Sequence, residues 1–182
     1  MEVLGFHRPE EERGYLSNWY LSDFSWKGIR FTSMEQYMMY RKAVFFHDDF
    51  IAAQILQTQD VAEVKQLGRL VSGYDDQLWS GVRQAVVYEG LIEKFGQNAV
   101  LLQQLMDTGD ALLAECAVSD KIWGIGLSMT DQDRLDRTKW RGKNLLGFAL
   151  MMVRTHFLPV PTQEKKGNTR HTVRAAAEQA EA

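Results

Sequence analysis

Hydrophobic and polar residues alternate along the first thirty positions and then adopt a helical period. The segment "DFSWKGIRF" (23–31) places a Lys-Gly pair between short aromatic and β-branched runs, which is typical of a β-hairpin. After this segment apolar residues recur at helical spacing, and the pattern predicts a helix that begins near Thr32. Thr32 and Ser33 precede Glu35 and Gln36 by three residues, so a capping box fits either register.

Five further helices are predicted downstream. Asp60 begins a capping-box pattern, Gly96 is a natural helix stop, and Asn98 is a natural helix start. The segment "ALLAECAV" (111–118) is too short for a helix of ordinary length, which leaves a strand as the alternative. The polar, glycine-containing stretch 117–143 is expected to be a loop. The predicted helices cover 48–58, 60–71, 75–95, 98–109 and 144–156.

These elements predict a mainly α (α+β) fold, a single compact helical domain with a small N-terminal β-hairpin and minor strands. A chain of 182 residues, of which 45% are hydrophobic, is long enough to bury one core. We expect this domain to span 1–157. The segment 158–182 holds two of the three prolines and few large apolar residues, so it is expected to be a flexible polar tail.

Composition narrows the class of function. The net charge of −3 and the pI of about 5.8 argue against a protein held on nucleic acid by phosphate neutralisation alone, because such binding needs a basic face, but they do not exclude recognition of one modified nucleotide. One cysteine and four scattered histidines provide neither a disulfide framework nor metal-ligand spacing, so no metal or cofactor is expected. The N-terminus lacks a signal-peptide pattern, and the longest apolar stretch (145–153) is far short of the roughly 20 residues of a membrane span. A cytoplasmic protein without membrane contact is expected.

The helix that begins near Thr32 carries the first candidate chemistry. Glu35 and Lys42 are seven residues apart, so both side chains leave the same helix face, about 10 Å apart along the axis. Two interpretations are open, a solvated surface pair or the floor of an active site. The neighbouring "MMY" and "AVFF" segments suggest burial, and burial of Lys42 would lower its pKa toward a reactive free amine.

Two loop-like clusters place polar groups among aromatic residues. In "GYLSNWY" (14–20), Ser17 and Asn18 offer hydrogen bonds and Trp19 offers a stacking surface, whereas the simpler interpretation is a turn beside core aromatics. In "SDKIWGIG" and "KWRGKNLLG", the residues Asp120, Trp123 and Trp140 lie among glycines. There the alternatives are a ligand site and two tryptophans that cover the core.

Arginines next to a tryptophan form a third candidate. Trp79 and Arg83 are one helical turn apart, and Arg69 lies in "LGR" (67–69). An arginine beside an indole can hold a phosphate next to a stacked base. The alternative is a cation–π pair on a helix surface.

Taken in order, these segments resemble the NADAR, or YbiA-like, domain family. The resemblance extends over roughly 14–157 and rests on "LSNW", "FTSMEQYMMYRKA", "LGR", Trp79 with Arg83, "TGDALLAE", "SDKIWGIGL" and "WRGKNLLGFALMMVR". It implies a small, mainly helical N-glycosidase that needs no cofactor. One implied substrate is ADP-ribose on the amino group of guanine, in DNA or a nucleotide, with a DarT-type toxin as functional partner. The other is the ribosylamino-pyrimidine phosphates of riboflavin synthesis.

Both substrates join ribose C1 to an exocyclic amine of a guanine-like ring, and the resemblance implies roles for particular residues. Lys42 is the expected nucleophile, which displaces the base by transimination. Glu35 and Asp120 are the expected acid and base, with the roles unassigned between them. Direct hydrolysis by these two carboxylates is the alternative chemistry. The residues implied in substrate binding are Ser17, Asn18, Trp19, Arg69, Trp79, Arg83, Trp123, Gly124, Trp140 and Asn144.

Two other classes of function stay open from the sequence. One is a module that binds ADP-ribose or a nucleotide without cleaving it. The other is a helical interaction protein that has no small-molecule site. The intact set of Glu35, Lys42 and Asp120 favours the enzyme, and de-ADP-ribosylation is the favoured activity because it is widespread in the family. The segment 128–139 is longer than in short family members and is expected to influence substrate choice.

Overall fold

The computed structural model describes residues 2–159, so the predicted tail lies outside the described residues from position 160 onward. The described part of the chain forms six α-helices, three short 3-10 helices and four strands. In chain order these elements are β1 (Val3–Phe6), η1 (Gly14–Leu16), β2 (Leu21–Trp26), β3 (Ile29–Ser33), α1 (Met34–Phe45), α2 (Asp49–Gln57), α3 (Val61–Arg69), α4 (Asp76–Gly96), α5 (Ala99–Met106), β4 (Leu112–Glu115), η2 (Gln132–Leu135), η3 (Arg137–Lys139) and α6 (Leu145–His156).

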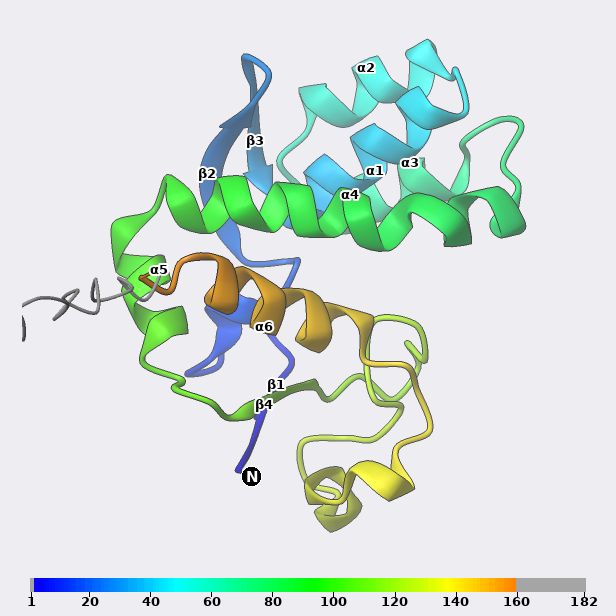
Figure 1. Ribbon diagram of the computed structural model, residues 1–182. Coiled ribbons are helices and arrows are strands. Elements are labelled where there is room, and N and C mark those ends of the chain that lie inside the picture. The colour runs from blue at the N-terminus through cyan, green and yellow to red at the C-terminus, as the bar shows by residue number, and fades with distance from the viewer. Residues whose placement is uncertain (1, 160–182) are drawn as a thin grey trace, which may run out of the picture.

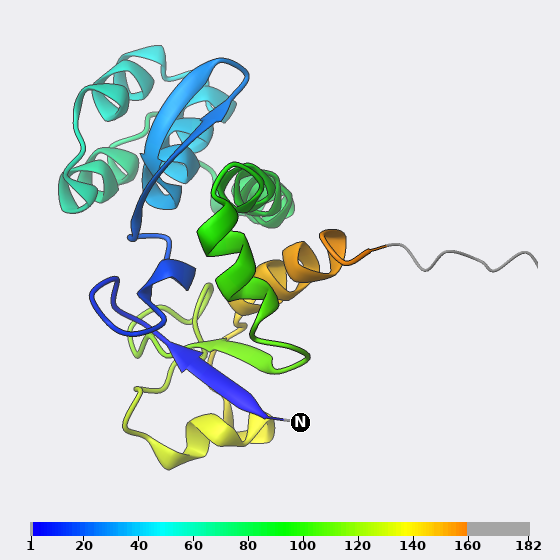
Figure 2. The same ribbon diagram turned by 90° about the vertical axis from the view of Figure 1, so that its left-hand side faces the viewer.

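The long helix α4 lies between two groups of elements (Figure 1). On one side are the β2–β3 hairpin and helices α1, α2 and α3, and α4 packs directly against α1. On the other side are α6 and the β1–β4 pair, with the long segment that connects β4 to α6 (Figure 2). The mainly α fold with a hairpin and minor strands is therefore confirmed.

The predicted hairpin forms between β2 and β3. These antiparallel strands pair Phe24 with Phe31 and Trp26 with Ile29. Lys27 and Gly28 connect them with positive φ angles of 48° and 82°. Positive φ at both central residues is the geometry of a type I′ turn, whose twist matches that of the flanking strands.

The segment predicted as a possible strand forms β4, which pairs in parallel with β1. The pairing joins Val3 to Leu112 and Phe6 to Glu115, so the start of the chain is tied to a segment more than a hundred residues away. Asn144 holds the other side of β4, because its Oδ1 accepts from the Glu115 N–H and its Nδ2 donates to the Leu113 carbonyl. This buried asparagine is the residue before α6 and has a left-handed φ of 53°.

Helix caps follow the sequence pattern with two exceptions. Ser33 caps α1 by accepting from the Gln36 N–H, and Gln36 Oε1 accepts from Thr32 N. This arrangement leaves Glu35 outside the cap. Asn98 was predicted to cap α5, but its side chain makes no cap hydrogen bond and donates instead to the carbonyls of Asp23 and Lys94. Gly96 is the last residue of α4 rather than the residue after it.

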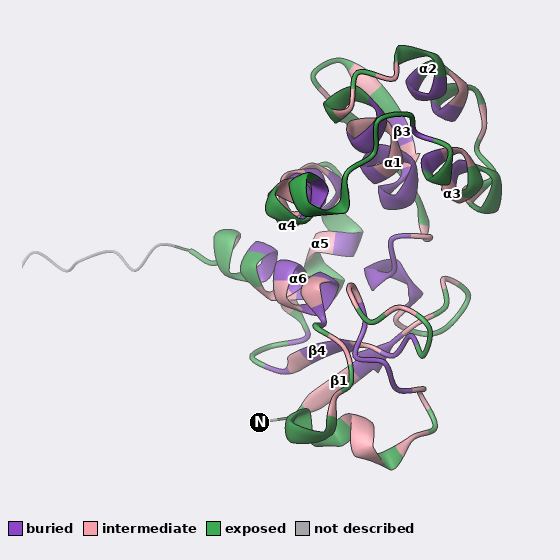
Figure 3. Ribbon diagram, turned by 90° about the vertical axis from the view of Figure 1, so that its right-hand side faces the viewer, coloured by how far each residue is buried: buried purple, intermediate pink, exposed green. Residues whose placement is uncertain are grey.

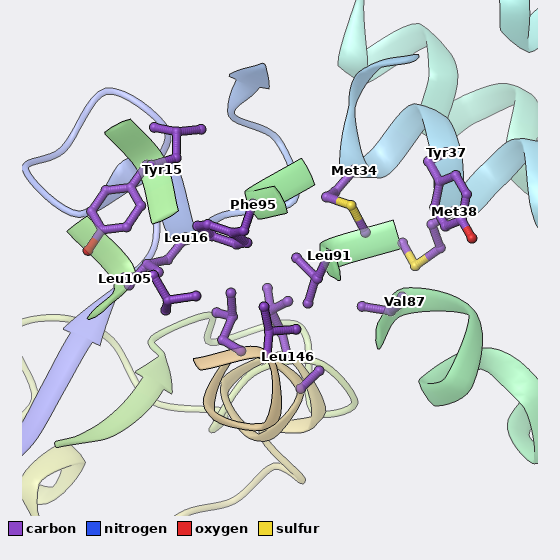
Figure 4. Close-up of a cluster of buried hydrophobic side chains, with 14 of the residues drawn as sticks. Tyr15, Leu16, Met34, Tyr37, Met38, Val87, Leu91, Phe95, Leu105 and Leu146 are labelled. Carbon is purple, nitrogen blue, oxygen red and sulfur yellow. The ribbon is translucent and has the colours of Figure 1, made fainter. Parts of the chain in front are cut away.

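The main core fills the space where α1, α4 and α6 meet. Tyr15, Leu16, Phe95 and Leu105 lie at one end of the cluster and Met34, Tyr37, Met38 and Val87 at the other, with Leu91 and Leu146 between them (Figure 4). Buried residues recur along α4 and α6 between intermediate and exposed ones, whereas α1 is buried without interruption from Met34 to Met38 (Figure 3). Within residues 2–159, no helix is long and apolar enough to cross a membrane.

Close contact between α1 and α4 depends on the absence of a side chain at Gly90. A Cβ atom at this position would lie 2.4 Å from the ring of Tyr37 and 2.9 Å from the Met34 methyl. We therefore expect Gly90→Ala to reduce the free energy of unfolding by about 1–3 kcal/mol, as overpacking does. Urea unfolding followed by circular dichroism measures the change.

Gly81→Ala is the matched control on the same helix, because a Cβ atom at Gly81 has no neighbour within 4 Å among the described residues. This variant is expected to be neutral or to gain up to about 1 kcal/mol from helix propensity. Equal stability of the two variants would contradict the packing explanation.

Candidate active site

A cavity of about 200 Å³ lies between helices α1 and α3 on one side and the end of β4 on the other. Two loops complete its wall, the one before β2 and the one after β4. The lining residues are Asn18, Trp19, Glu35, Met38, Met39, Lys42, Lys65, Gly68, Arg69, Glu115, Asp120 and Trp123. A site of this size takes one sugar-sized group, since sites for whole drug-sized ligands occupy roughly 300–1,000 Å³.

Helix α1 supplies the two residues that the sequence pattern singled out. Glu35, Met38 and Lys42 are spaced by three and four residues, so they share the face that lines the cavity. Only 3% of Glu35 and 9% of Lys42 is exposed. The Glu35 backbone N–H donates to the Asn18 carbonyl at 2.8 Å, which ties the first turn of α1 to the loop before β2.

The amine of Lys42 contacts protein groups instead of water. Its Nζ donates to the Gly68 carbonyl at 2.7 Å and lies 4.0 Å from the centre of the Tyr74 ring. Burial lowers the pKa of Lys42, and the carboxylates of Asp76 and Glu35 partly offset this shift. The amine is therefore easier to deprotonate than a solvated lysine.

Three carboxyl groups share the cavity with this amine. Burial raises the pKa of Glu35 to about 6, with the charge of Lys65 opposing the shift and that of Asp120 adding to it. Burial also raises the pKa of Glu115 to about 8, with further increases from Asp120 and Glu35. Asp120 Oδ1 accepts from the N–H groups of Ile122 and Trp123, at 2.9 and 2.8 Å, which fixes its carboxylate.

A wholly buried lysine anchors the loop before β2. Lys94 Nζ donates to the carbonyls of Tyr15 at 2.7 Å and Ser17 at 3.4 Å. Burial lowers the pKa of Lys94 to about 7. Because Asn18 and Trp19 follow directly, this contact sets the position of two residues that line the cavity.

Two polar atoms of the cavity wall lack a partner within residues 2–159. They are Oδ1 of Asn18 and Oε2 of Glu115, and both are shielded from solvent. Buried polar atoms are nearly always hydrogen-bonded, so unpaired ones inside a cavity point to a ligand that supplies the missing groups. The hydroxyl and amino groups of a sugar–base conjugate are donors of this kind.

Seven of the residues expected from the sequence meet at this cavity: Asn18, Trp19, Glu35, Lys42, Arg69, Asp120 and Trp123. Lys42 lies in the same cavity as Asp120 and two indoles, and away from bulk water, as the covalent hypothesis requires.

Six expected residues do not line the cavity. Trp79 is buried beside Phe45, with ring centres 6.0 Å apart, and buried Arg83 lies 3.6 Å from Asp76 in an ion pair. The Trp140 indole N–H donates to the Arg134 carbonyl, so this tryptophan covers a small core cluster instead of a ligand.

The other three residues, Ser17, Gly124 and Asn144, contact residues of the cavity wall without lining the cavity themselves. Ser17 Oγ accepts from the Trp19 N–H, which is the turn that the simpler interpretation expected. The Gly124 carbonyl accepts from Asn144 N, and a Cβ at Gly124 would lie 2.8 Å from the Glu115 carbonyl. Asn144 holds β4 through its side chain, as described above.

The sequence interpretation missed Lys65 and Glu115. Lys65 lies one turn before Arg69 on α3, so the spacing of the two cations was visible in the sequence. Glu115 ends the "TGDALLAE" segment, but its place at the cavity depends on contacts with distant residues, the pairing of β4 with β1 and the hydrogen bond to Asn144.

Comparison with known proteins identifies the family to which the cavity-forming part of the chain belongs. The NADAR domain model matches residues 5–158, which include every residue of the cavity wall. The chain belongs to the NADAR family.

Two curated NADAR relatives indicate the breadth of the family. "N-glycosidase R617" of Acanthamoeba polyphaga mimivirus is 40% identical over 124 residues, which are 68% of this chain and 73% of the relative. "Riboflavin biosynthesis protein VVA0006" of Vibrio vulnificus is 32% identical over 153 residues, which are 84% of this chain and 38% of the relative.

A solved NADAR structure has the same fold. The NMR structure of the E. coli protein YbiA superposes with a TM-score of 0.71 and 26% sequence identity, and the match covers 85% of this chain and 84% of that one. Proteins of the same name from Shigella flexneri are named N-glycosidases. The relatives thus support a glycosidase activity for this NADAR chain.

The raised pKa of Glu115 predicts a pH-dependent stability. Between the ordinary pKa of 4.5 and the folded value of about 8, the folded chain retains a proton that the unfolded chain has released. The free energy of unfolding therefore falls as pH rises through this window. Glu115→Gln removes the titration, so its stability relative to the wild type should increase steadily from pH 5 to pH 8 in urea unfolding.

Glu10→Gln is the control, because Glu10 is exposed. It should follow the wild type at every pH. A stability difference between Glu115→Gln and the wild type that stays constant with pH would contradict the assignment of a buried titrating carboxyl.

Proposed function

We propose that the chain is an N-glycosidase that hydrolyses the bond between ribose C1 and an exocyclic amine of a guanine-like base. The observation that carries this proposal is the buried amine of Lys42 in one cavity with the carboxyl groups of Glu35, Glu115 and Asp120. A desolvated lysine serves as a nucleophile toward an imine, and adjacent carboxyl groups move the protons that such exchange requires.

The proposed reaction passes through a Schiff base on Lys42. The ribosylamine ring opens to an iminium ion, and the free amine of Lys42 adds to C1. A proton then passes from the lysine nitrogen to the base nitrogen, and the base leaves as a free amine. Water adds to the lysine–sugar Schiff base, and loss of Lys42 releases the sugar as an aldehyde that closes to its ring form.

The cavity wall offers groups for each part of the substrate. The cavity takes the ribose, because its volume of about 200 Å³ is too small for a dinucleotide. The cations of Lys65 and Arg69 line the cavity, and we assign them to the phosphate. The indoles of Trp19 and Trp123 offer stacking surfaces for the base.

ADP-ribosyl-guanine is the substrate that we favour, in DNA or in a nucleotide. Two cations on one side of a sugar-sized cavity suit a pyrophosphate that extends away from the ribose. Under this proposal a DarT-type toxin, which attaches ADP-ribose to guanine, is the functional partner. Action on a flipped or single-stranded base also agrees with the net charge of −3, since it requires no extended basic surface.

The ribosylamino-pyrimidine phosphates of riboflavin synthesis are the second candidate substrates. The relative from Vibrio vulnificus, which is named a riboflavin biosynthesis protein, favours this alternative. These compounds contain the same glycosylamine linkage and carry one phosphate, so the same cavity groups would act on them.

The role of Lys42 is tested by substitution. Lys42→Ala should reduce the release of ADP-ribose from ADP-ribosylated guanosine by on the order of 10³-fold or more, because loss of a covalent nucleophile has effects of this size. Borohydride should trap a sugar adduct on the wild type and none on the variant. Lys27→Met is the control, since Lys27 is exposed in the turn of the β2–β3 hairpin and does not line the cavity. Full turnover by Lys42→Ala without a trapped adduct would favour direct hydrolysis by the carboxylates.

The phosphate role of Arg69 predicts a selective loss of affinity. Arg69→Met should raise KM for ADP-ribosylated guanosine by about 10- to 100-fold, because a hydrogen bond to a charged group contributes roughly 1.5–3 kcal/mol. The same variant should leave the KM for N2-ribosyl-guanosine unchanged, since this substrate has no phosphate. Arg30→Met on the exposed hairpin is the control. An equal rise in KM for both substrates would show that Arg69 acts on something other than phosphate.

A further inference from the structure

The carboxyl group of Glu115 lines the cavity and lacks a hydrogen-bond partner for one of its oxygens among the described residues. This oxygen, Oε2, is shielded from solvent. By contrast, Asp120 Oδ1 already accepts two backbone N–H groups. Glu35 interacts with the Trp19 indole and with the charge of Lys65. Glu115 therefore keeps an oxygen free for a ligand.

The backbone of Glu115 is fixed on both sides. Its N–H donates to Asn144 Oδ1 at 3.0 Å, and its carbonyl accepts from the N–H groups of Ala117 and Ile125 at 3.0 and 2.8 Å. Parallel pairing with Phe6 of β1 adds a further constraint. A catalytic group on such a rigid strand end keeps its position relative to a bound substrate.

The charges around Glu115 favour its neutral form. Asp120 from the loop and Glu35 from α1 act on it as negative charges, and Lys65 from α3 acts as a positive charge. Lys42 and Arg69 line the same cavity. Burial and the two neighbouring carboxylates raise the pKa of Glu115 to about 8, so it carries a proton at neutral pH. A protonated carboxyl in a sugar-sized cavity is placed to act as a general acid.

We propose that Glu115 is a catalytic residue that delivers its proton to the ring oxygen of the ribose and so opens the ring. This inference rests on the proposed function and assigns its first step. In that step the bond from C1 to the ring oxygen breaks while the lone pair of the exocyclic nitrogen forms a C1–N double bond. The ring oxygen takes the Glu115 proton and becomes a hydroxyl group.

The proton returns to Glu115 later in the cycle. After the base has left, water adds to C1 of the Lys42 Schiff base, and the Glu115 carboxylate takes the proton that this water loses. The hydroxyl proton of the resulting carbinolamine then passes to the lysine nitrogen as Lys42 leaves. Protons balance over the cycle, and no oxidant or reductant takes part. Glu35 and Asp120 remain for the proton transfers between the two nitrogens.

Two aldehyde probes separate ring opening from Schiff-base formation. Ribose 5-phosphate must open its ring before Lys42 can react, whereas glycolaldehyde has two carbons and forms no such ring. Cyanoborohydride traps either Schiff base, and peptide mass spectrometry measures the adduct at Lys42, with Lys42→Met giving the background. We expect Glu115→Gln to slow trapping of ribose 5-phosphate by about 100-fold or more, the usual range for a general acid. Trapping of glycolaldehyde should be unchanged.

A conservative variant and a pH series strengthen the test. Glu115→Asp keeps an acid at a shorter reach and should recover part of the ribose 5-phosphate rate. The ratio of the two trapping rates cancels the titration of Lys42 itself. In the wild type this ratio should fall above about pH 8 as Glu115 loses its proton, and in Glu115→Gln it should not vary with pH.

The outcomes distinguish this inference from the proposed function. If Glu115→Gln slows both probes equally, or neither, while the wild type forms both adducts, the acid role of Glu115 is overturned and the covalent N-glycosidase stands. If the wild type forms no adduct with either probe, the covalent route itself is overturned, and this inference with it. Cooperative urea unfolding of each variant ensures that a loss of rate is not a loss of fold.

Discussion

Removal of ionisable groups from water is the constraint on which this structure depends. Lys42 and Glu35 lie on one face of α1, and packing of that face toward α3 and the loop before β2 leaves both groups largely without solvent. Burial disfavours the charged form of each group. It therefore lowers the pKa of the Lys42 amine and raises the pKa of the Glu35 and Glu115 carboxyl groups in the same cavity. The pairing of a neutral nucleophile with a neutral acid is unusual in water and ordinary in such a cavity.

Local sequence signals were sufficient for most of the fold and for part of the site. The hairpin turn and the caps at Ser33 and Asp60 depend on residues within a few positions of one another, so the pattern predicted them. The shared face of Glu35 and Lys42 follows from helix geometry alone. Asp120 was a candidate from its glycine-containing loop, and the NADAR resemblance added its expected role as acid or base.

The parts of the fold and of the site that the sequence did not predict depend on contacts between distant parts of the chain. The pairing of β1 with β4 has no local signature, and together with the hydrogen bond to Asn144 it fixes Glu115 at the cavity. Trp79 and Arg83 have residue types that suit a ligand site, but the burial of that face of α4 assigns them to the core and to an ion pair. Asn144 and Lys94 illustrate the same limit, because their partners are backbone carbonyls and N–H groups that no sequence pattern displays.

The parallel pairing of β1 with β4 also has a consequence for biosynthesis. A ribosome delivers β1 first, and its partner strand emerges only after more than a hundred further residues. At roughly 5–20 residues per second, that interval lasts several seconds or more, during which the edge of β1 has no native neighbour. Glu115, Asp120 and Trp123 of the cavity wall are all synthesised at or after β4, so a nascent chain that ends before β4 lacks this side of the site.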